Sequence, residues 1–99
     1  MIPEFGNLTN LVGLYLSQNQ LSGTIPEFSS LMLLQELDLY QNQLTGTIPK
    51  FGNLTHLLYI YLYQNQLTGT IPEFSSLTQL QYLFPVSYTH LTLPTTPYV

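Results

Sequence analysis

Few residues of this 99-residue chain have side chains that could carry chemistry: five acids, one Lys, two His and no Cys. Glu36 and Asp38 alternate with leucines, so both would point to the same face of an extended strand. Paired carboxylates serve acid–base catalysis or hold cations, but the pattern places no third acid or His beside them. His56 is isolated from any nucleophile. We therefore predict no catalytic residues, no metal site, no cofactor and no enzyme activity.

Composition excludes two further classes of partner. Charged residues make up 6% of the chain, and the net charge is −4. One Lys and no Arg cannot supply the phosphate contacts on which nucleic-acid binding depends. The longest apolar run, residues 57–63, is far shorter than the ~20 residues that span a bilayer. We predict no nucleic-acid partner and no membrane contact within this segment, and the composition leaves the compartment unknown.

The elements that would position the two acids are set by an internal repeat. Isoleucine followed by proline recurs every 23 residues, at Ile2, Ile25, Ile48 and Ile71. Three full units are followed by a partial fourth, and units one and three share FGNLT while units two and four share FSSL. A period of this length is typical of solenoids, in which each unit covers the apolar face of its neighbour. A lone unit could not fold, because about eight buried apolar side chains do not offset the entropy of ordering the backbone.

Each unit follows the pattern Leu-x-x-Leu-x-Leu-x-x-Asn-x-Leu-x-Gly-x-Ile-Pro. In the first unit these positions are Leu11, Leu14, Leu16, Asn19, Leu21, Gly23, Ile25 and Pro26. Over residues 1–84 the chain resembles the leucine-rich repeat family, and the Leu-x-Gly-x-Ile-Pro ending resembles its plant-type subclass, with a unit one residue shorter than usual. The resemblance implies an α/β-type repeat solenoid, a horseshoe segment with a parallel concave sheet and otherwise mostly irregular or 3-10 coil.

Local patterning places the strands and an asparagine row within each unit. The alternation Leu14-Tyr15-Leu16 is typical of a half-buried strand, and the repeat predicts strands over residues 13–17, 36–40, 59–63 and 82–84. Asparagine follows three of these strands, where its amide can bond the backbone of two coils. We predict a buried structural ladder of Asn19, Asn42 and Asn65.

Solvent-facing strand positions would align into stripes across the concave face. Tyrosine offers a large apolar surface and a polar tip at low entropic cost, which suits recognition. It also favours strands and pairs well across them, so a purely structural role stays open. The predicted ligand-binding residues, for a protein, peptide or glycan ligand, are Tyr15, Glu36, Asp38, Tyr40, Tyr59, Tyr61, Tyr63, Tyr82 and Phe84.

Two other features concern modification and the C-terminal end. Asn7 and Asn53 begin Asn-Leu-Thr sequons and are candidates for N-glycosylation. Register is lost at Pro85, and from Val86 the residues VSYTHLTLPT resemble a translated sequencing-library adapter. We therefore divide the chain into repeats at 1–84 and a non-native tail at 85–99, and we exclude that tail from fold reasoning.

The family resemblance implies non-catalytic ligand or protein recognition, as in part of a receptor-like protein or receptor kinase ectodomain. Two alternatives stay open: a secreted inhibitor of cell-wall-degrading hydrolases, and an intracellular or bacterial-surface scaffold. Under the leading hypothesis the parent protein would be extracellular or at the cell surface.

Overall fold

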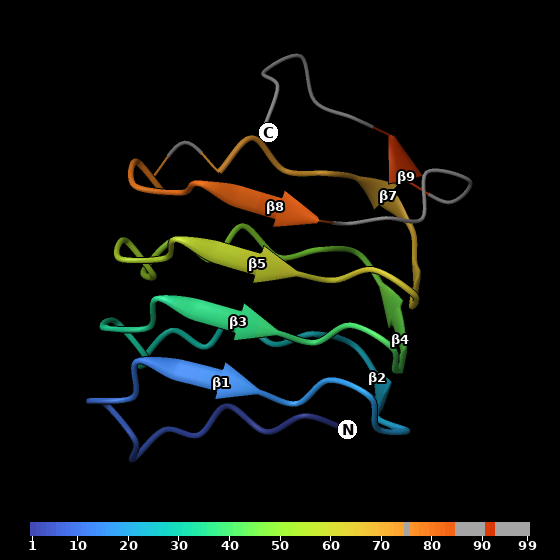
Figure 1. Cartoon of the computed structure of the whole chain (residues 1–99), viewed down its shortest axis with the longest axis horizontal. Coiled ribbons are helices and arrows are strands. Elements are labelled where there is room, and N and C mark those ends of the chain that lie inside the picture. The colour runs from blue at the N-terminus through green and yellow to red at the C-terminus, as the bar shows by residue number, and fades with distance from the viewer. Residues whose placement is uncertain (75, 85–90, 93–99) are drawn as a thin grey trace.

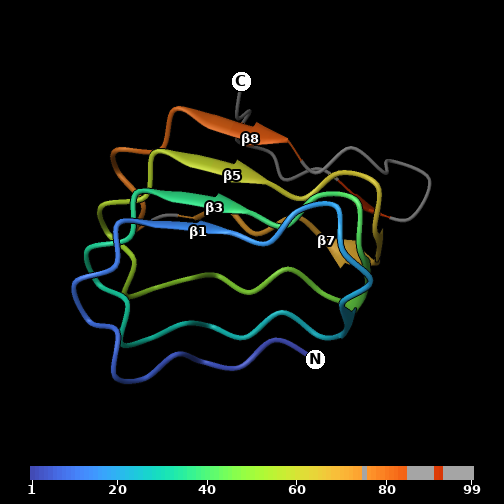
Figure 2. The same ribbon diagram turned by 60° about the horizontal axis from the view of Figure 1, so that its bottom comes forward.

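A computed structural model describes residues 1–74, 76–84 and 91–92 of the chain. The chain winds through successive coils, each of which contributes one strand to a main sheet and returns along the opposite side of the molecule (Figures 1 and 2). Every strand pair is parallel. No helix in the described ranges is long and apolar enough to cross a membrane. The predicted solenoid with a parallel sheet is confirmed.

The main sheet has the order β1-β3-β5-β8. Its strands are β1 (Gly13–Tyr15), β3 (Glu36–Asp38), β5 (Tyr59–Tyr61) and β8 (Tyr82–Phe84). Each strand pairs with the residues one repeat away, as Gly13 does with Glu36 and Glu36 with Tyr59. The first three strands end two residues earlier than predicted. Backbone hydrogen bonds between neighbouring coils still continue past the ends of these strands, since the Leu16 N–H donates to the Asp38 carbonyl at 2.9 Å.

A second row of short strands lies where each coil leaves the main sheet, and sequence patterning did not predict it. The strands β2 (Ser22–Gly23), β4 (Gln43–Gly46) and β6 (Gln66–Leu67) form a parallel sheet. A separate pair joins β7 (Gly69–Thr70) to β9 (Leu91–Thr92). The predicted tail at 85–99 lies outside the described residues apart from the β9 backbone.

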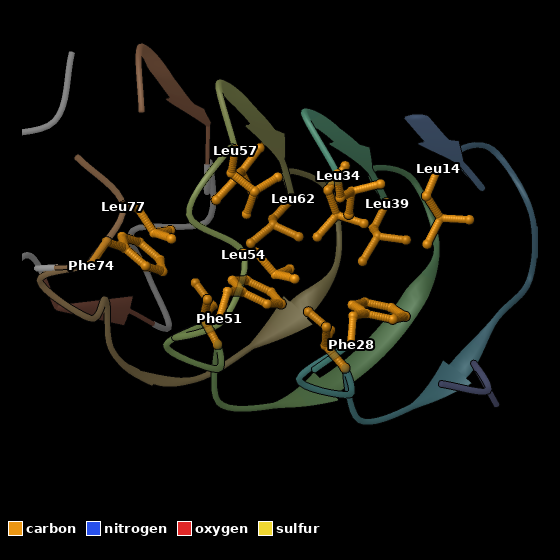
Figure 3. Packing of buried hydrophobic residues seen from close by; sticks show 14 of the residues in the cluster. Leu14, Phe28, Leu34, Leu39, Phe51, Leu54, Leu57, Leu62, Phe74 and Leu77 are labelled. Carbon is orange, nitrogen blue, oxygen red and sulfur yellow. The ribbon is translucent and has the colours of Figure 1, made fainter. Parts of the chain in front are cut away.

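The core fills the space between the main sheet and the returning segments (Figure 3). Leucines from successive coils stack in rows, and Leu34, Leu39 and Leu44 of the second coil are fully buried. The equivalent Leu11, Leu16 and Leu21 of the first coil are only partly buried. Each coil therefore depends on a neighbour for its burial, as expected when stability is shared between adjacent repeats.

Phenylalanines form a spine on the side of the core opposite the main sheet (Figure 3). Phe28 stacks between Phe5 and Phe51, with ring centroids 6.3 and 6.4 Å apart, and Phe51 stacks on Phe74 at 6.3 Å. All four have positive φ, between 52° and 59°. The left-handed backbone is costly for a bulky residue. This left-handed conformation at each Phe turns the chain inward within the few residues that separate Ile-Pro from the next buried leucine.

The asparagine ladder is present in two of its three predicted positions. Asn42 and Asn65 are 8% and 9% exposed. Asn42 Nδ2 donates to the Leu16 carbonyl of the preceding coil at 3.0 Å, and Asn42 Oδ1 accepts from the Leu21 N–H at 3.1 Å. The prediction of a buried Asn19 is wrong. Asn19 is exposed and bonds only carbonyls of its own coil, because no coil of this structure packs on that side of residues 16–21.

Candidate ligand-binding face

The main sheet has one face against the core and one face open. In β1, β3 and β5 the middle residue points into the core: Leu14 is 7% exposed, and Leu37 and Ile60 are fully buried. The residues before and after it point to the other side because side chains alternate along a strand. We call this open side the concave face. Its described residues are Gly13, Tyr15, Ser17, Glu36, Asp38, Tyr40, Tyr59, Tyr61 and Tyr63.

Four tyrosines of the concave face are in mutual contact. The rings of Tyr40 and Tyr63 stack with centroids 4.5 Å apart and planes 7° apart. Tyr59 and Tyr61 lie nearly parallel at 6.5 Å, and Tyr61 meets Tyr40 edge to face at 6.5 Å. The four rings form one aromatic cluster, which we call the tyrosine cluster. Such pairs are favourable by about 0.5 to 1.5 kcal/mol beyond the area they bury.

The structure describes the side chain of some of the remaining predicted residues and only the backbone of others. Tyr15 is 64% exposed and its ring lies over Gly13, in the space that a Cβ there would take. The backbones of Tyr82 and Phe84 lie in β8, in register with Tyr59 and Tyr61. The structure describes only the backbone of these two residues. Aromatic residues therefore occur in β1, β5 and β8, while β3 places Glu36 and Asp38 at the aligned positions.

Glu36 and Asp38 occupy the centre of the concave face and interact with each other. In register, Asp38 lies between Tyr15 of β1 and Tyr61 of β5. Burial, the hydrogen bond with Glu36 and the negative charge of Glu36 together raise the pKa of Asp38 to about 7, and burial is the largest of these causes. Near neutral pH Asp38 is therefore partly protonated, and its proton lies in the hydrogen bond between the two carboxyl groups. The Oδ1 atom of Asp38 is buried without a hydrogen-bond partner, as is the Oγ atom of Ser17.

The negative charge of Asp38 also acts on Tyr63 of the tyrosine cluster. Partial desolvation raises the pKa of Tyr63, and the neighbouring Tyr40 and Asp38 raise it further, with a hydrogen bond to Tyr40 as the smallest cause. Tyr63 is thus protonated and neutral at physiological pH. The tyrosine cluster presents aromatic faces and hydroxyl groups next to the two acids. Sequence patterning placed these residues on one face, but it gave no sign of the proton shared by Glu36 and Asp38.

The described side chains of the concave face do not form a metal site. No group of three or more metal-ligating side chains occurs within the part of the chain that the structure describes. His56 lies outside the main sheet, is exposed, and places Nδ1 3.1 Å from the Met32 carbonyl oxygen. It has no contact with the concave acids. The face combines aromatic area, hydroxyl groups and carboxyl groups, with no nucleophile activated by a neighbouring base.

The two sequons lie away from this face. Asn7 and Asn53 are exposed and stand in the turns that follow Phe5 and Phe51, outside the main sheet. Asn53 Nδ2 donates to the Ser29 carbonyl at 3.1 Å. The two asparagines occupy equivalent positions two coils apart. Glycans attached there would leave the concave face uncovered.

Comparison with known structures found plant receptor ectodomains. The chain is 34% identical, with a TM-score of 0.79, to the Arabidopsis receptor kinase HAESA in complex with the peptide hormone IDA and the co-receptor SERK1. It is 35% identical, with a TM-score of 0.82, to the plant peptide hormone receptor RGFR1 in complex with RGF2. These alignments cover 92% and 93% of this chain but only 15% of each receptor chain.

A third structure gives the same result over more of its own length. The ectodomain of the receptor kinase SOBIR1 from Arabidopsis thaliana is 28% identical, with a TM-score of 0.74, and the alignment covers 96% of this chain and 66% of that one. A comparison with curated proteins returned no match. The family models "Leucine Rich repeats (2 copies)" and "Leucine Rich Repeat" match residues 9–53 and 56–77. The chain therefore belongs to the leucine-rich repeat family, and its repeats are of the plant type.

Proposed function

We propose that the chain is a non-catalytic recognition segment of a receptor-like ectodomain, and that it binds a peptide or protein ligand on its concave face. The observation that carries the proposal is the tyrosine cluster beside Glu36 and Asp38. These residues come from consecutive coils and face away from the core. Tyrosines in such clusters supply much of the binding energy at protein interfaces.

The structural neighbours support a peptide as the ligand. Two of them are plant receptors solved with peptide hormones, and the alignments cover nearly all of this chain. Because the chain spans about 15% of those receptors, the activity of a whole receptor is a further proposal. The repeats would contribute one stretch of a longer binding surface.

A purely structural role for the tyrosines is the competing explanation. Tyrosine favours strands, so Tyr61 would also stabilise the sheet. Binding and folding can be separated by measuring both for the same variants. Tyr61 contacts both Tyr40 and Tyr59, whereas Thr55 is exposed and lies outside the main sheet.

The experiment starts from a displayed library of short random peptides selected against the purified chain. Selected peptides are then titrated against Tyr61→Ala and the matched control Thr55→Ala, with thermal melting of each variant. We expect Tyr61→Ala to weaken affinity by about 1 to 3 kcal/mol, and Thr55→Ala to leave it unchanged. Equal effects of the two substitutions, or a Tyr61→Ala effect on melting alone, would contradict the proposal.

A further inference from the structure

The concave face carries an uncompensated negative charge. Glu36 and Asp38 lie at its centre, and no Lys or Arg side chain shares that face among the residues that the structure describes. The only basic residue, Lys50, is exposed and lies between Pro49 and Phe51, outside the main sheet. Two neighbouring carboxyl groups without a cation are unfavourable when both are ionised. A positive group bound between them would remove that cost.

From this arrangement we infer that the concave face binds a Lys or Arg side chain of an extended peptide, held by Glu36 and Asp38 and flanked by Tyr15 and Tyr61. The inference rests on the proposed function and adds the chemical class of the ligand. An ammonium or guanidinium group would donate hydrogen bonds to the carboxylates of Glu36 and Asp38.

The aromatic surroundings favour the same kind of ligand. In the sheet register Asp38 lies directly between Tyr15 and Tyr61, and Glu36 lies beside Tyr59. Aromatic faces attract cations, Arg above all, when the charge lies within about 6 Å of the ring centre. Tyr15 is exposed, and its ring lies over Gly13, in the space that a side chain there would take. The two acids and the neighbouring tyrosine rings therefore both favour a positively charged ligand.

A metal ion fits this face less well than a side chain. Calcium takes six to eight oxygen ligands and magnesium requires near-octahedral geometry. The concave face offers two carboxyl groups and no third acid or His within the described ranges. Two carboxylates match the several donors of one ammonium or guanidinium group. The peptide side chain is therefore the occupant to which the geometry points.

Binding should be linked to pH through the shared proton. The groups that face Asp38 are Glu36 on the same strand, Tyr15 of β1, Tyr61 of β5, and Tyr40 and Tyr63 after the strand ends. Tyr63 stays protonated near neutral pH because its pKa is raised, and Asp38 titrates there. A bound cation would displace the proton of Asp38, whose pKa is about 7. Affinity should rise about tenfold from pH 6 to pH 8.

The test uses the peptides selected by the displayed library and two charge variants of the full chain. The first variant combines Glu36→Gln with Asp38→Asn, which preserves side-chain size. The control is Glu4→Gln, which removes one acid from an exposed site outside the main sheet. Affinities are measured by calorimetry at pH 6 and pH 8, and folding by circular dichroism. Each selected peptide is also made with its Lys or Arg replaced by norleucine.

We expect the selected peptides to share a Lys or Arg at a fixed position. The double variant and the norleucine peptides should each lose at least about tenfold in affinity, and Glu4→Gln less than about twofold. If the double variant fails to fold, the norleucine peptides test the same contact from the ligand side. Peptides that bind without a basic residue would overturn this inference and leave peptide recognition intact. Selection of no peptide at all would overturn both.

Discussion

Asn65 hydrogen-bonds to Leu44 of the preceding coil, where the Leu44 N–H donates to the Asn65 Oδ1 atom at 3.0 Å. The same side chain donates through Nδ2 to the Leu39 carbonyl at 2.9 Å and to the Leu62 carbonyl of its own coil at 3.2 Å. One amide thus satisfies backbone groups of two coils at the point where the strands end. This contact keeps successive strands of the concave face in register.

Replacing Asn65 by Ala should therefore destabilise the fold strongly. The change removes the Asn65 acceptor of the buried Leu44 N–H and one of the two amide donors to the Leu39 carbonyl, which keeps its bond from Asn42 Nδ2. We expect a cost of about 1 to 3 kcal/mol. Asn19→Ala is the matched control, because Asn19 is exposed and bonds only its own coil. We expect that change to cost less than about 1 kcal/mol. Chemical denaturation of both variants measures the difference, and equal losses would contradict the interpretation of the ladder.

Gly46 should tolerate no side chain. Its φ is +81°, and a Cβ built there would lie 3.0 Å from Thr24 Cγ2. We expect Gly46→Ala to cost about 1 to 2 kcal/mol from the left-handed backbone alone. Gly52→Ala is the control, since its Cβ would meet no atom within 4 Å. A thermal melt in which the two variants shift equally would show that the turn at Gly46 is not restrained as described.

The proton shared by Asp38 and Glu36 should make stability depend on pH. The folded pKa of Asp38, about 7, lies above its ordinary value of 3.8. The folded state therefore binds more protons than the unfolded state between these limits. The stabilisation that protonated Asp38 contributes is fully present below pH 4. It decreases as the pH rises toward 7 and does not change further above pH 7.

Asp38→Asn should remove this dependence and stabilise the chain at pH 8. The gain is expected to be no more than about 1 kcal/mol, the scale of a partly exposed pair of charges. Unfolding free energies of both proteins at pH 5 and pH 8 check the prediction. A wild-type chain that is more stable at pH 8 than the asparagine variant would show that the carboxylate is compensated by another group.

Asn7 and Asn53 should be glycosylated when the chain is expressed through a secretory pathway. Both asparagines are exposed in turns outside the main sheet, and both begin Asn-Leu-Thr sequons. Intact mass before and after glycosidase treatment measures occupancy, and Asn7→Gln and Asn53→Gln assign each glycan. Because the sites lie away from the concave face, peptide affinity should not change on deglycosylation. A change in affinity would place a glycan within reach of the ligand.

The exact period made the main sheet predictable. A repeat of constant length puts equivalent residues on neighbouring strands, so Gly13, Glu36, Tyr59 and Tyr82 had to align once the coil was recognised. The alternation of leucine with polar or aromatic residues then assigned each side chain to a face. Nothing comparable marks β2, β4 and β6, which are only two to four residues long and rich in polar residues, with Gly in β2 and β4.

Other features depend on contacts between coils rather than on one unit. Asn19 has the same repeat position as Asn65 but is exposed, because burial requires a preceding coil. The left-handed backbone of Phe28 and Phe51 results from the tight turn after Ile-Pro, which composition does not reveal. The shared proton of Glu36 and Asp38 depends on their distance and burial. Sequence patterning therefore predicted where the candidate site lies but not its electrostatics.

Mapping a bound peptide by backbone amide chemical shifts tests the central claim most directly. An isotope-labelled chain is titrated with a peptide selected from the displayed library, and shift changes are compared between the main sheet and the turns after Phe5, Phe28 and Phe51. We predict that the largest changes occur at Tyr15, in Glu36–Asp38 and in Tyr59–Tyr61. Changes concentrated in the turns, with the strands of the concave face unaffected, would contradict recognition by that face.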